Sequence, residues 1–453
     1  MGHAGLSPAP AGSWRAGAAT ASAAVLAGVW AAELGHLVLR SAVLSAAARA
    51  GLVLFLGLAL LRASGHIRWL FVAVCGVAVG LSVWQGHADA LREGLRQVQV
   101  FGAFLPSVLM MRATVQASPR SQRLQQGMQA LTALQARHWT LVGCAGLGSV
   151  LNVGAMAMLA PVVARGADEA TRAELAGCAA KGVGAAIMWS PFFVAMAFTS
   201  QLVPGVPLWQ AMATGGGLAV LALALAQALF IPGLRARDAQ RSVRALGPLA
   251  APMVVVIGGV LVLVALGFTG LQAVALWLPL ACGAYLVRAG AGATGAAARS
   301  TFAHFARLSD ELLIIVGAQL MGIAVAAVPE VRQWAQELLP TLVSGAPLLV
   351  LMVAVLVALG QLGLHPMIGV GLAVPIVAAG PFGIAPVVIV VAGVFAWALS
   401  ASVAIWTLPV AVAATTFGVP APRLLTRRSV AFGVLLWAAG CAYLAALNAW
   451  LMR

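Results

Sequence analysis

Charged side chains are scarce in this chain of 453 residues. Only 8% of the residues are charged while 62% are hydrophobic, and the mean hydropathy is +1.02. Soluble domains carry about 25% charged residues, so this composition excludes a soluble fold. Apolar stretches long enough to cross a bilayer recur along the sequence, whereas a membrane β-barrel would show short alternating segments. The sequence therefore predicts an all-α polytopic membrane protein.

Acidic residues are rare, and those within apolar stretches are rarer still. The chain has 11 Asp and Glu in all, and Lys181 is its single lysine. Asp310 and Glu311 stand where a helix is expected to begin, a position at which acids are ordinary. Glu33 lies in the first apolar stretch. A sodium–proton antiporter needs a buried carboxylate, so cation exchange is disfavoured.

Signatures of enzymes and metal sites are also missing. The sequence has no Walker motif, HExxH or GxSxG, so it offers no machinery for an ATP-driven pump or a membrane hydrolase. Its five cysteines form no CxxC pair, and neither disulfide nor zinc chemistry is expected. We therefore predict no enzymatic activity, no cofactor and no resident metal.

Basic residues occur in short loops between apolar runs, which is typical of cytoplasmic loops rather than of nucleic-acid binding. The most basic loop is predicted to be cytoplasmic and contains Arg235, Arg237, Arg241 and Arg244. Alternation from this loop places the loops with Arg92 and Arg332 outside, and with them Arg96. It does not assign Arg40 and Arg49 clearly to either side of the membrane.

About 11–13 membrane segments are predicted. They lie near 21–39, 50–63, 69–85, 95–111, 138–163, 174–202, 208–231, 249–268, 271–287, 311–328, 341–378, 384–415 and 429–450. The first is the weakest because it contains Glu33 and His36, and it is either a retained span or an interfacial helix. Segments 138–163, 174–202, 341–378 and 384–415 are too long or too interrupted for simple helices.

A faint internal repeat relates the two halves of the chain. Five matches in the same order lie between 212 and 215 residues apart, among them Ser190 with Ser402 and Gly205-Val206-Pro207 with Gly418-Val419-Pro420. The basic loops require 138–163 and one later segment to enter and leave the membrane on one side. We therefore predict two inverted-topology repeats, 50–232 and 249–453, each with a re-entrant helical hairpin and a broken helix. An N-terminal tail and weak span (1–49) and a basic linker (233–248) complete the organisation.

Helix-breaking residues cluster at the two predicted hairpin tips. The second tip reads "GQLGLHPMIG" from Gly360 to Gly369, and the first runs from Gly146 to Asn152. In lipid, backbone groups freed by a break need protein or a water-filled cavity around them. Half-helix ends carry partial charges that suit ions, so these tips are candidate binding sites.

A second pair of breaks follows the same logic. Trp189-Ser190-Pro191 interrupts 174–202, and Ser400-Ala401-Ser402 with Thr407 and Pro409 interrupts 384–415. Ordinary structural roles stay open for each residue. The prolines could kink packed helices, His365 could be a satisfied core histidine, and Gln319 and Gln361 could bridge helices. Lys181 either attracts an anion or extends to the membrane surface.

The paired tips and broken helices resemble the ion transporter superfamily, which includes divalent anion–sodium symporters, citrate and C4-dicarboxylate carriers and arsenite permeases. Tips in these carriers hold a Ser-Asn-Thr or Asn-Pro type motif. Ser149-Val-Leu-Asn152 and His365-Pro366 stand at the matching places, without an intact Ser-Asn-Thr and with His where Asn is expected. The resemblance implies an elevator mechanism, a sodium or proton gradient as driving force, and a homodimer.

We therefore predict secondary active transport, as symport, of a small carboxylate-like anion in the bacterial inner membrane, with lipids as the surrounding partners. Sodium, if it couples, would bind the tip carbonyls near Gly148 and Gly363; otherwise His365 would carry a proton. A channel and a lipid-modifying membrane enzyme remain the alternatives, although the enzyme lacks a carboxylate or second histidine beside His365. The predicted site residues are Ser149, Asn152, Ser190, Gln361, His365, Pro366, Ser400, Ser402 and Thr407.

Overall fold

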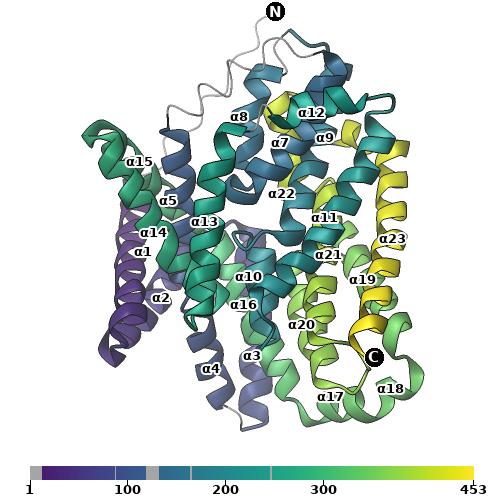
Figure 1. Cartoon of the computed structure of the whole chain (residues 1–453). Helices are drawn as coiled ribbons and strands as arrows, with labels where there is room; N and C mark the ends of the chain where they lie inside the picture. The colour runs from purple at the N-terminus through teal and green to yellow at the C-terminus, as the bar shows by residue number, and fades with distance from the viewer. Residues whose placement is uncertain (1–12, 87, 119–131, 164–165, 245–246) are drawn as a thin grey trace, which may run out of the picture.

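The computed structural model describes residues 13–86, 88–118, 132–163, 166–244 and 247–453. Within these ranges the regular secondary structure is entirely helical, as predicted (Figure 1). Arg120 and Arg123 of one expected cytoplasmic loop lie outside the described residues, as does the tail 1–12.

The helices of the first half precede the basic linker. They are α1 (Ser13–Leu39), α2 (Ala42–Arg62), α3 (Gly65–Trp84), α4 (Ala88–Val98), α5 (Phe101–Gln116), α7 (Ala133–Leu151), α8 (Gly154–Val163), α9 (Glu169–Trp189), α10 (Val194–Leu202) and α11 (Leu208–Phe230).

The linker forms α12 (Ala236–Arg244), and the second half follows it. Its elements are α13 (Gly247–Ala265), α14 (Gly270–Ala289), α15 (Ala291–Phe305), the 3-10 turn η1 (Ala306–Leu308), α16 (Ser309–Ala327), α17 (Pro329–Gln333), the π-helical turn η2 (Trp334–Leu338), α18 (Leu339–Leu342), α19 (Gly345–Gln361), α20 (Pro366–Ala379), α21 (Pro386–Val403), α22 (Leu408–Phe417), the 3-10 turn η3 (Ala421–Leu424) and α23 (Arg427–Leu451).

Ten helical segments in the described part of the chain are long and apolar enough to cross a membrane, or 11 if one bent pair counts as a span. The first predicted span is one of them, because Gly17–Leu39 is an unbroken apolar helix. Two predicted segments, 138–163 and 341–378, do not form single long helices. The first divides into α7 and α8 around Asn152, and the second into α19 and α20 around residues 362–365. These lengths and compositions indicate an integral membrane protein.

Breaks also occur where the sequence predicts broken helices. Helix α9 ends at Trp189 and α10 begins at Val194, and together they form one span of 34 residues. Helix α21 ends at Val403, so Ser400 and Ser402 belong to its last turns, and α22 begins after Thr407. The second break therefore lies a few residues later than the sequence indicated.

The broken helices lie at the centre of the bundle. In the most apolar window of Glu169–Leu202, 94% of residues are buried within the protein, against 11% in Gly65–Trp84. Helix α9 packs against α7, α11, α21 and α22. It approaches α7 closely at Gly182, where a Cβ atom would lie 2.8 Å from Cys144 Cβ. Within a membrane the hydrophobic effect does not drive helices together. Small residues at a helix crossing let the two backbones approach closely and pack.

Most of the basic loops gather at one end of the molecule. Helices α12 and α15 lie at the end opposite α4, α17 and α18 (Figure 1). Gln135 of α7 donates to Asp238 of α12 at 2.8 Å, and Arg423 pairs with Glu169 at the start of α9 at 3.0 Å. We call this the basic end. It corresponds to the side that the sequence predicts to be cytoplasmic.

Asn448 of α23 holds the loop that precedes α21. Its Oδ1 accepts from Ala385 N at 2.8 Å, its Nδ2 donates to Gly383 O at 2.9 Å, and the side chain is buried. Asn448→Ala leaves the buried Ala385 N–H unpaired and removes the hydrogen bond to the Gly383 carbonyl, so we expect a loss of about 1–3 kcal/mol in stability. Thermal unfolding in detergent measures it. Thr415→Ala, which removes an exposed hydroxyl bonded only to its own helix, is the control; equal melting temperatures for the two variants would contradict the assignment.

Candidate functional site

The first predicted tip is closed by its own polar side chains. Asn152 ends α7 with φ 57, a left-handed value that asparagine tolerates better than most residues. Its backbone N–H donates to Gly148 O at 2.8 Å, and its side-chain Oδ1 accepts from Val153 N at 2.8 Å. The Ser149 hydroxyl donates to Gly146 O at 2.7 Å. Both side chains therefore serve to terminate the helix.

Ser190 connects this tip to the break in the central helix. Its hydroxyl donates to the carbonyl oxygen of Ser149 at 2.5 Å and accepts from Phe192 N at 3.2 Å. The side chain is fully buried. The structure thus brings Ser149, Asn152 and Ser190 into one cluster in the first half of the chain.

The second tip turns through Gly363, which has φ 90. Gln361 and Gly363 are exposed, whereas His365 is half-buried and caps α20 by accepting from Met367 N at its Nδ1 atom, 3.3 Å away. Pro366 is the first residue of α20, where its missing N–H is harmless. The His365 ring meets Trp397 of α21 edge-on, with 5.8 Å between ring centroids.

The residues of the second break divide between two neighbours. A Cβ atom at Gly360 would lie 2.7 Å from Ser400 Oγ, so Ser400 faces the second tip. Ser400 Oγ is buried and has no hydrogen-bond partner among the described residues. Ser402 bonds Ala398 O at 2.7 Å and faces Gly184 of α9 in the first half. Thr407 bonds the carbonyls of Ala401 and Ala404 at 3.1 and 2.7 Å.

The structure therefore groups Ser149, Asn152 and Ser190 in the first half, but in the second half it brings only Ser400 to the predicted tip. Helices α9 and α21 pack against each other where Ser402 faces Gly184. Lys181 does not extend to the membrane surface. Its Nζ is buried, bonds Ser429 Oγ at 3.1 Å, and lies 5.0 Å from the ring centroid of Phe230.

A partly open cavity of about 830 Å³ lies beside the first break and extends to Pro191. It is formed by the end of α1, the start of α2, the end of α4, helix α10 and the loops 203–207 and 264–272. Helix α4 is at the end opposite the basic end (Figure 1). None of the nine predicted site residues lines the cavity. Its charged and titratable lining residues are Glu33, His36, Arg40, Arg49 and Arg96.

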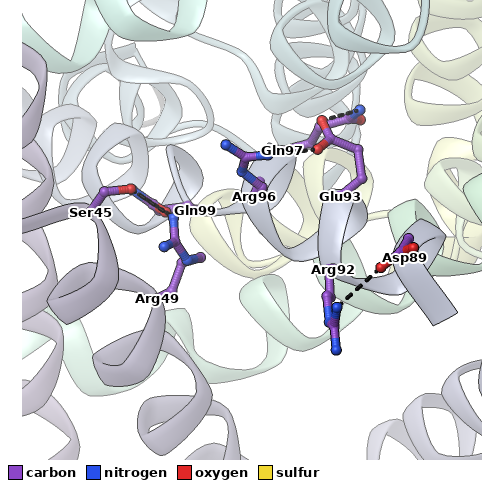
Figure 2. A network of polar contacts seen from close by, with 8 residues as sticks. All are labelled: Ser45, Arg49, Asp89, Arg92, Glu93, Arg96, Gln97 and Gln99. Carbon is purple, nitrogen blue, oxygen red and sulfur yellow. Dashed lines mark hydrogen bonds and ion pairs between the residues drawn. The ribbon is translucent and has the colours of Figure 1, made fainter. Parts of the chain in front are cut away.

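Four side chains form a hydrogen-bonded network on the wall of this cavity. Gln99 donates through Nε2 to the Glu33 carboxylate and accepts at Oε1 from Arg49 at 3.2 Å. Arg49 also donates to Ser45 Oγ at 2.7 Å. Figure 2 shows Ser45, Arg49 and Gln99 grouped together, apart from the surface pair of Asp89 and Arg92. This network fixes the guanidinium group at the cavity wall.

Three arginines against one glutamate make the cavity positive. Arg40 lies at the corner between α1 and α2 with φ 51, a left-handed value that is unusual for arginine. Arg96 pairs at the surface with Glu93 at 3.5 Å. Neither Arg40 nor Arg49 forms a salt bridge among the described residues. A concave site with unpaired guanidinium groups attracts and orients small anions.

The sequence contains a signal for this cavity in charged residues that do not fit the membrane pattern. Arg40 and Arg49 were the basic residues that did not fit the predicted orientation, and Glu33 was the acid that weakened the first span. Charged residues within membrane-spanning segments are energetically costly, and those that occur there usually serve a function. Comparisons with protein-family models and with curated proteins find no match for this chain.

Proposed function

We propose that the protein is a secondary active transporter of a small organic anion, with the cavity as its outward-facing entrance. The observation that carries this proposal is a cavity lined by Arg40, Arg49 and Arg96 that reaches the helix break at Pro191. Guanidinium groups bind carboxylates in a fork geometry. The helix that resumes after the break begins with a positive N-terminal end, which favours anions.

Two re-entrant hairpins in inverted repeats form part of the proposal, and several contacts support them. Arg137 near the start of α7 pairs with Glu174 of α9, which joins the start of the first segment to the helix that follows it. Gly345 N at the start of α19 donates to Phe382 O beyond α20 at 2.8 Å, which joins the ends of the second. Helices α7 and α8 lie in the upper half of Figure 1 and α20 in the lower half.

The packing of the breaks also supports a repeat. Helix α10 of the first half packs against α20 and α21, and α22 of the second half packs against α8 and α9. Each short helix thus meets the hairpin and the broken helix of the other half. This exchange is the arrangement expected of two inverted copies around a shared site.

Counterflow in proteoliposomes tests the function. Vesicles loaded in turn with unlabelled acetate, lactate, succinate, citrate, phosphate or sulfate should take up the matching labelled anion faster than protein-free vesicles for at least one of the six. An imposed sodium or proton gradient should then drive its accumulation. Failure of all six anions to exchange would contradict the proposal, and a continuous ionic conductance in planar bilayers would favour a channel instead.

A further inference from the structure

Glu33 is an acid inside a membrane-spanning helix and on the wall of the cavity. It is 3% exposed and lies two turns from the end of α1. Burying a carboxylate within a span is costly, and such residues are kept where they bind ions, protons or substrates. The nine residues that the sequence singled out do not include it.

Glu33 is joined to Arg49 through the Gln99 amide and not by direct contact. The Nε2 of Gln99 donates to Glu33, and its Oε1 accepts from Arg49. No salt bridge of Glu33 or Arg49 occurs among the described residues. The guanidinium group therefore keeps donors free for an incoming anion, while its positive charge still acts on the carboxylate next to it.

The other charged and titratable groups that line the cavity with Glu33 are basic. His36 is one turn further along α1, and Arg49 comes from α2. Arg40 and Arg96 line the same cavity. Helix α15 and η1 meet α1 where Phe305 packs on Trp30, and they carry further basic groups. Helices α5 and α14 also pack against α1. The titratable residues of these four elements are Arg112, Cys282, Tyr285, Arg288, Arg299, His304 and Arg307, and α2, which also packs against α1, adds Arg62.

We propose that Glu33 takes up the proton that is transported together with the anion. This inference rests on the proposed function. When an anion binds at Arg49, a second negative charge arrives close to the Glu33 carboxylate. Two negative charges in the same site repel each other, and this repulsion favours protonation of one of them. A proton from the outside solution, reached through the cavity, then forms an O–H bond at Glu33. By linkage, the protonated form binds the anion more tightly.

This coupling makes two predictions about gradients. Uptake should be driven by an inward proton gradient and should not require sodium. Glu33→Gln keeps the shape and the hydrogen bonding of a protonated glutamate but cannot exchange a proton. In this variant, the ratio of proton-driven uptake to counterflow should fall at least tenfold. Glu33→Asp keeps a carboxyl group and should restore part of that ratio.

The experiment uses purified protein in liposomes and the anion that the wild type exchanges fastest among the six named above. Counterflow and proton-driven uptake are measured on the same preparations, and gel filtration checks that each variant is monodisperse. Glu330→Gln is the matched control, because Glu330 is an exposed acid in the short helix α17, away from the cavity lining.

The outcomes separate the two proposals. Loss of proton drive in Glu33→Gln, with proton drive retained in Glu330→Gln, supports the role of Glu33. Wild-type uptake that is driven by a sodium gradient alone, or a Glu33→Gln variant with wild-type proton drive, overturns this inference and leaves the transporter assignment standing. Absence of counterflow in the wild type overturns the transporter assignment and, with it, this inference.

Discussion

Replacing Arg49 by alanine should reduce anion uptake by one to two orders of magnitude. The expected cause is the loss of a charge-assisted hydrogen bond to the bound anion, worth about 1.5–3 kcal/mol or roughly 10- to 100-fold in affinity. The effect should appear as a higher KM for uptake, because the guanidinium group binds the solute at the cavity wall, where its hydrogen bonds go to Ser45 and Gln99. Initial rates of uptake across a range of anion concentrations measure it.

Two further variants make this prediction specific. Arg92→Ala removes the same charge from the same end of the molecule, but Arg92 is exposed, pairs with Asp89 at 3.1 Å and does not line the cavity. It should leave KM within twofold of the wild type at physiological salt, because exposed charges are screened over about 8 Å. Arg49→Lys keeps the charge but loses the fork geometry, so an intermediate KM is expected. Equal effects of Arg49→Ala and Arg92→Ala would show that only the overall field matters.

A single methyl group at Gly215 should destabilise the protein severely. Gly215 of α11 lies against the last turn of α9, where a Cβ atom would collide with the carbonyl oxygen of Met188 and approach its carbonyl carbon to 2.9 Å. Those atoms are backbone and cannot rotate away, so α11 must separate from the Ser190 break. Overpacking of this kind costs about 1–3 kcal/mol or more. We expect Gly215→Ala to lower the melting temperature and the yield of monodisperse protein.

The neighbouring glycine supplies the control. A Cβ atom at Gly216 would meet no atom within 4 Å, so Gly216→Ala should be neutral or should stabilise α11 by up to about 1 kcal/mol through helix propensity. The two variants differ by one position in the same helix. Indistinguishable melting curves for them would mean that the packing of α11 on the break is looser than the structure indicates.

Much of the helical framework could be predicted from local sequence. The breaks at Asn152, Ser190 and Pro366 follow from residues that stop a helix or tolerate unusual backbone angles, which is a property of a few neighbouring residues. The break in 384–415 was placed too early, because Ser400 and Ser402 continue α21. Serine in a buried helix can bond its own turn, as Ser402 does with Ala398, so it does not by itself end the helix.

The candidate site was predictable only in part. The contacts of Ser190 with Ser149 and of Ser400 with Gly360 join each predicted break to the predicted tip of its own half. The cavity residues could not be predicted as a site, because no local pattern links Glu33, Arg49 and Arg96, which come from three different helices. The environment of Lys181 could not be predicted for the same reason, since its neighbours Phe230 and Ser429 belong to α11 and α23.

By itself the sequence determined that this protein is a helical membrane protein, where most of its helices stop, and which loops share the basic end. Hydropathy, chain-breaking residues and loop charge decide these properties locally, because each depends on a segment and its solvent. The tertiary structure alone decided that charges from α1, α2 and α4 surround one cavity beside the break at Pro191. Lateral packing of helices brings together lining residues that lie as far apart along the chain as Glu33 and Gln272, and no local segment specifies such packing.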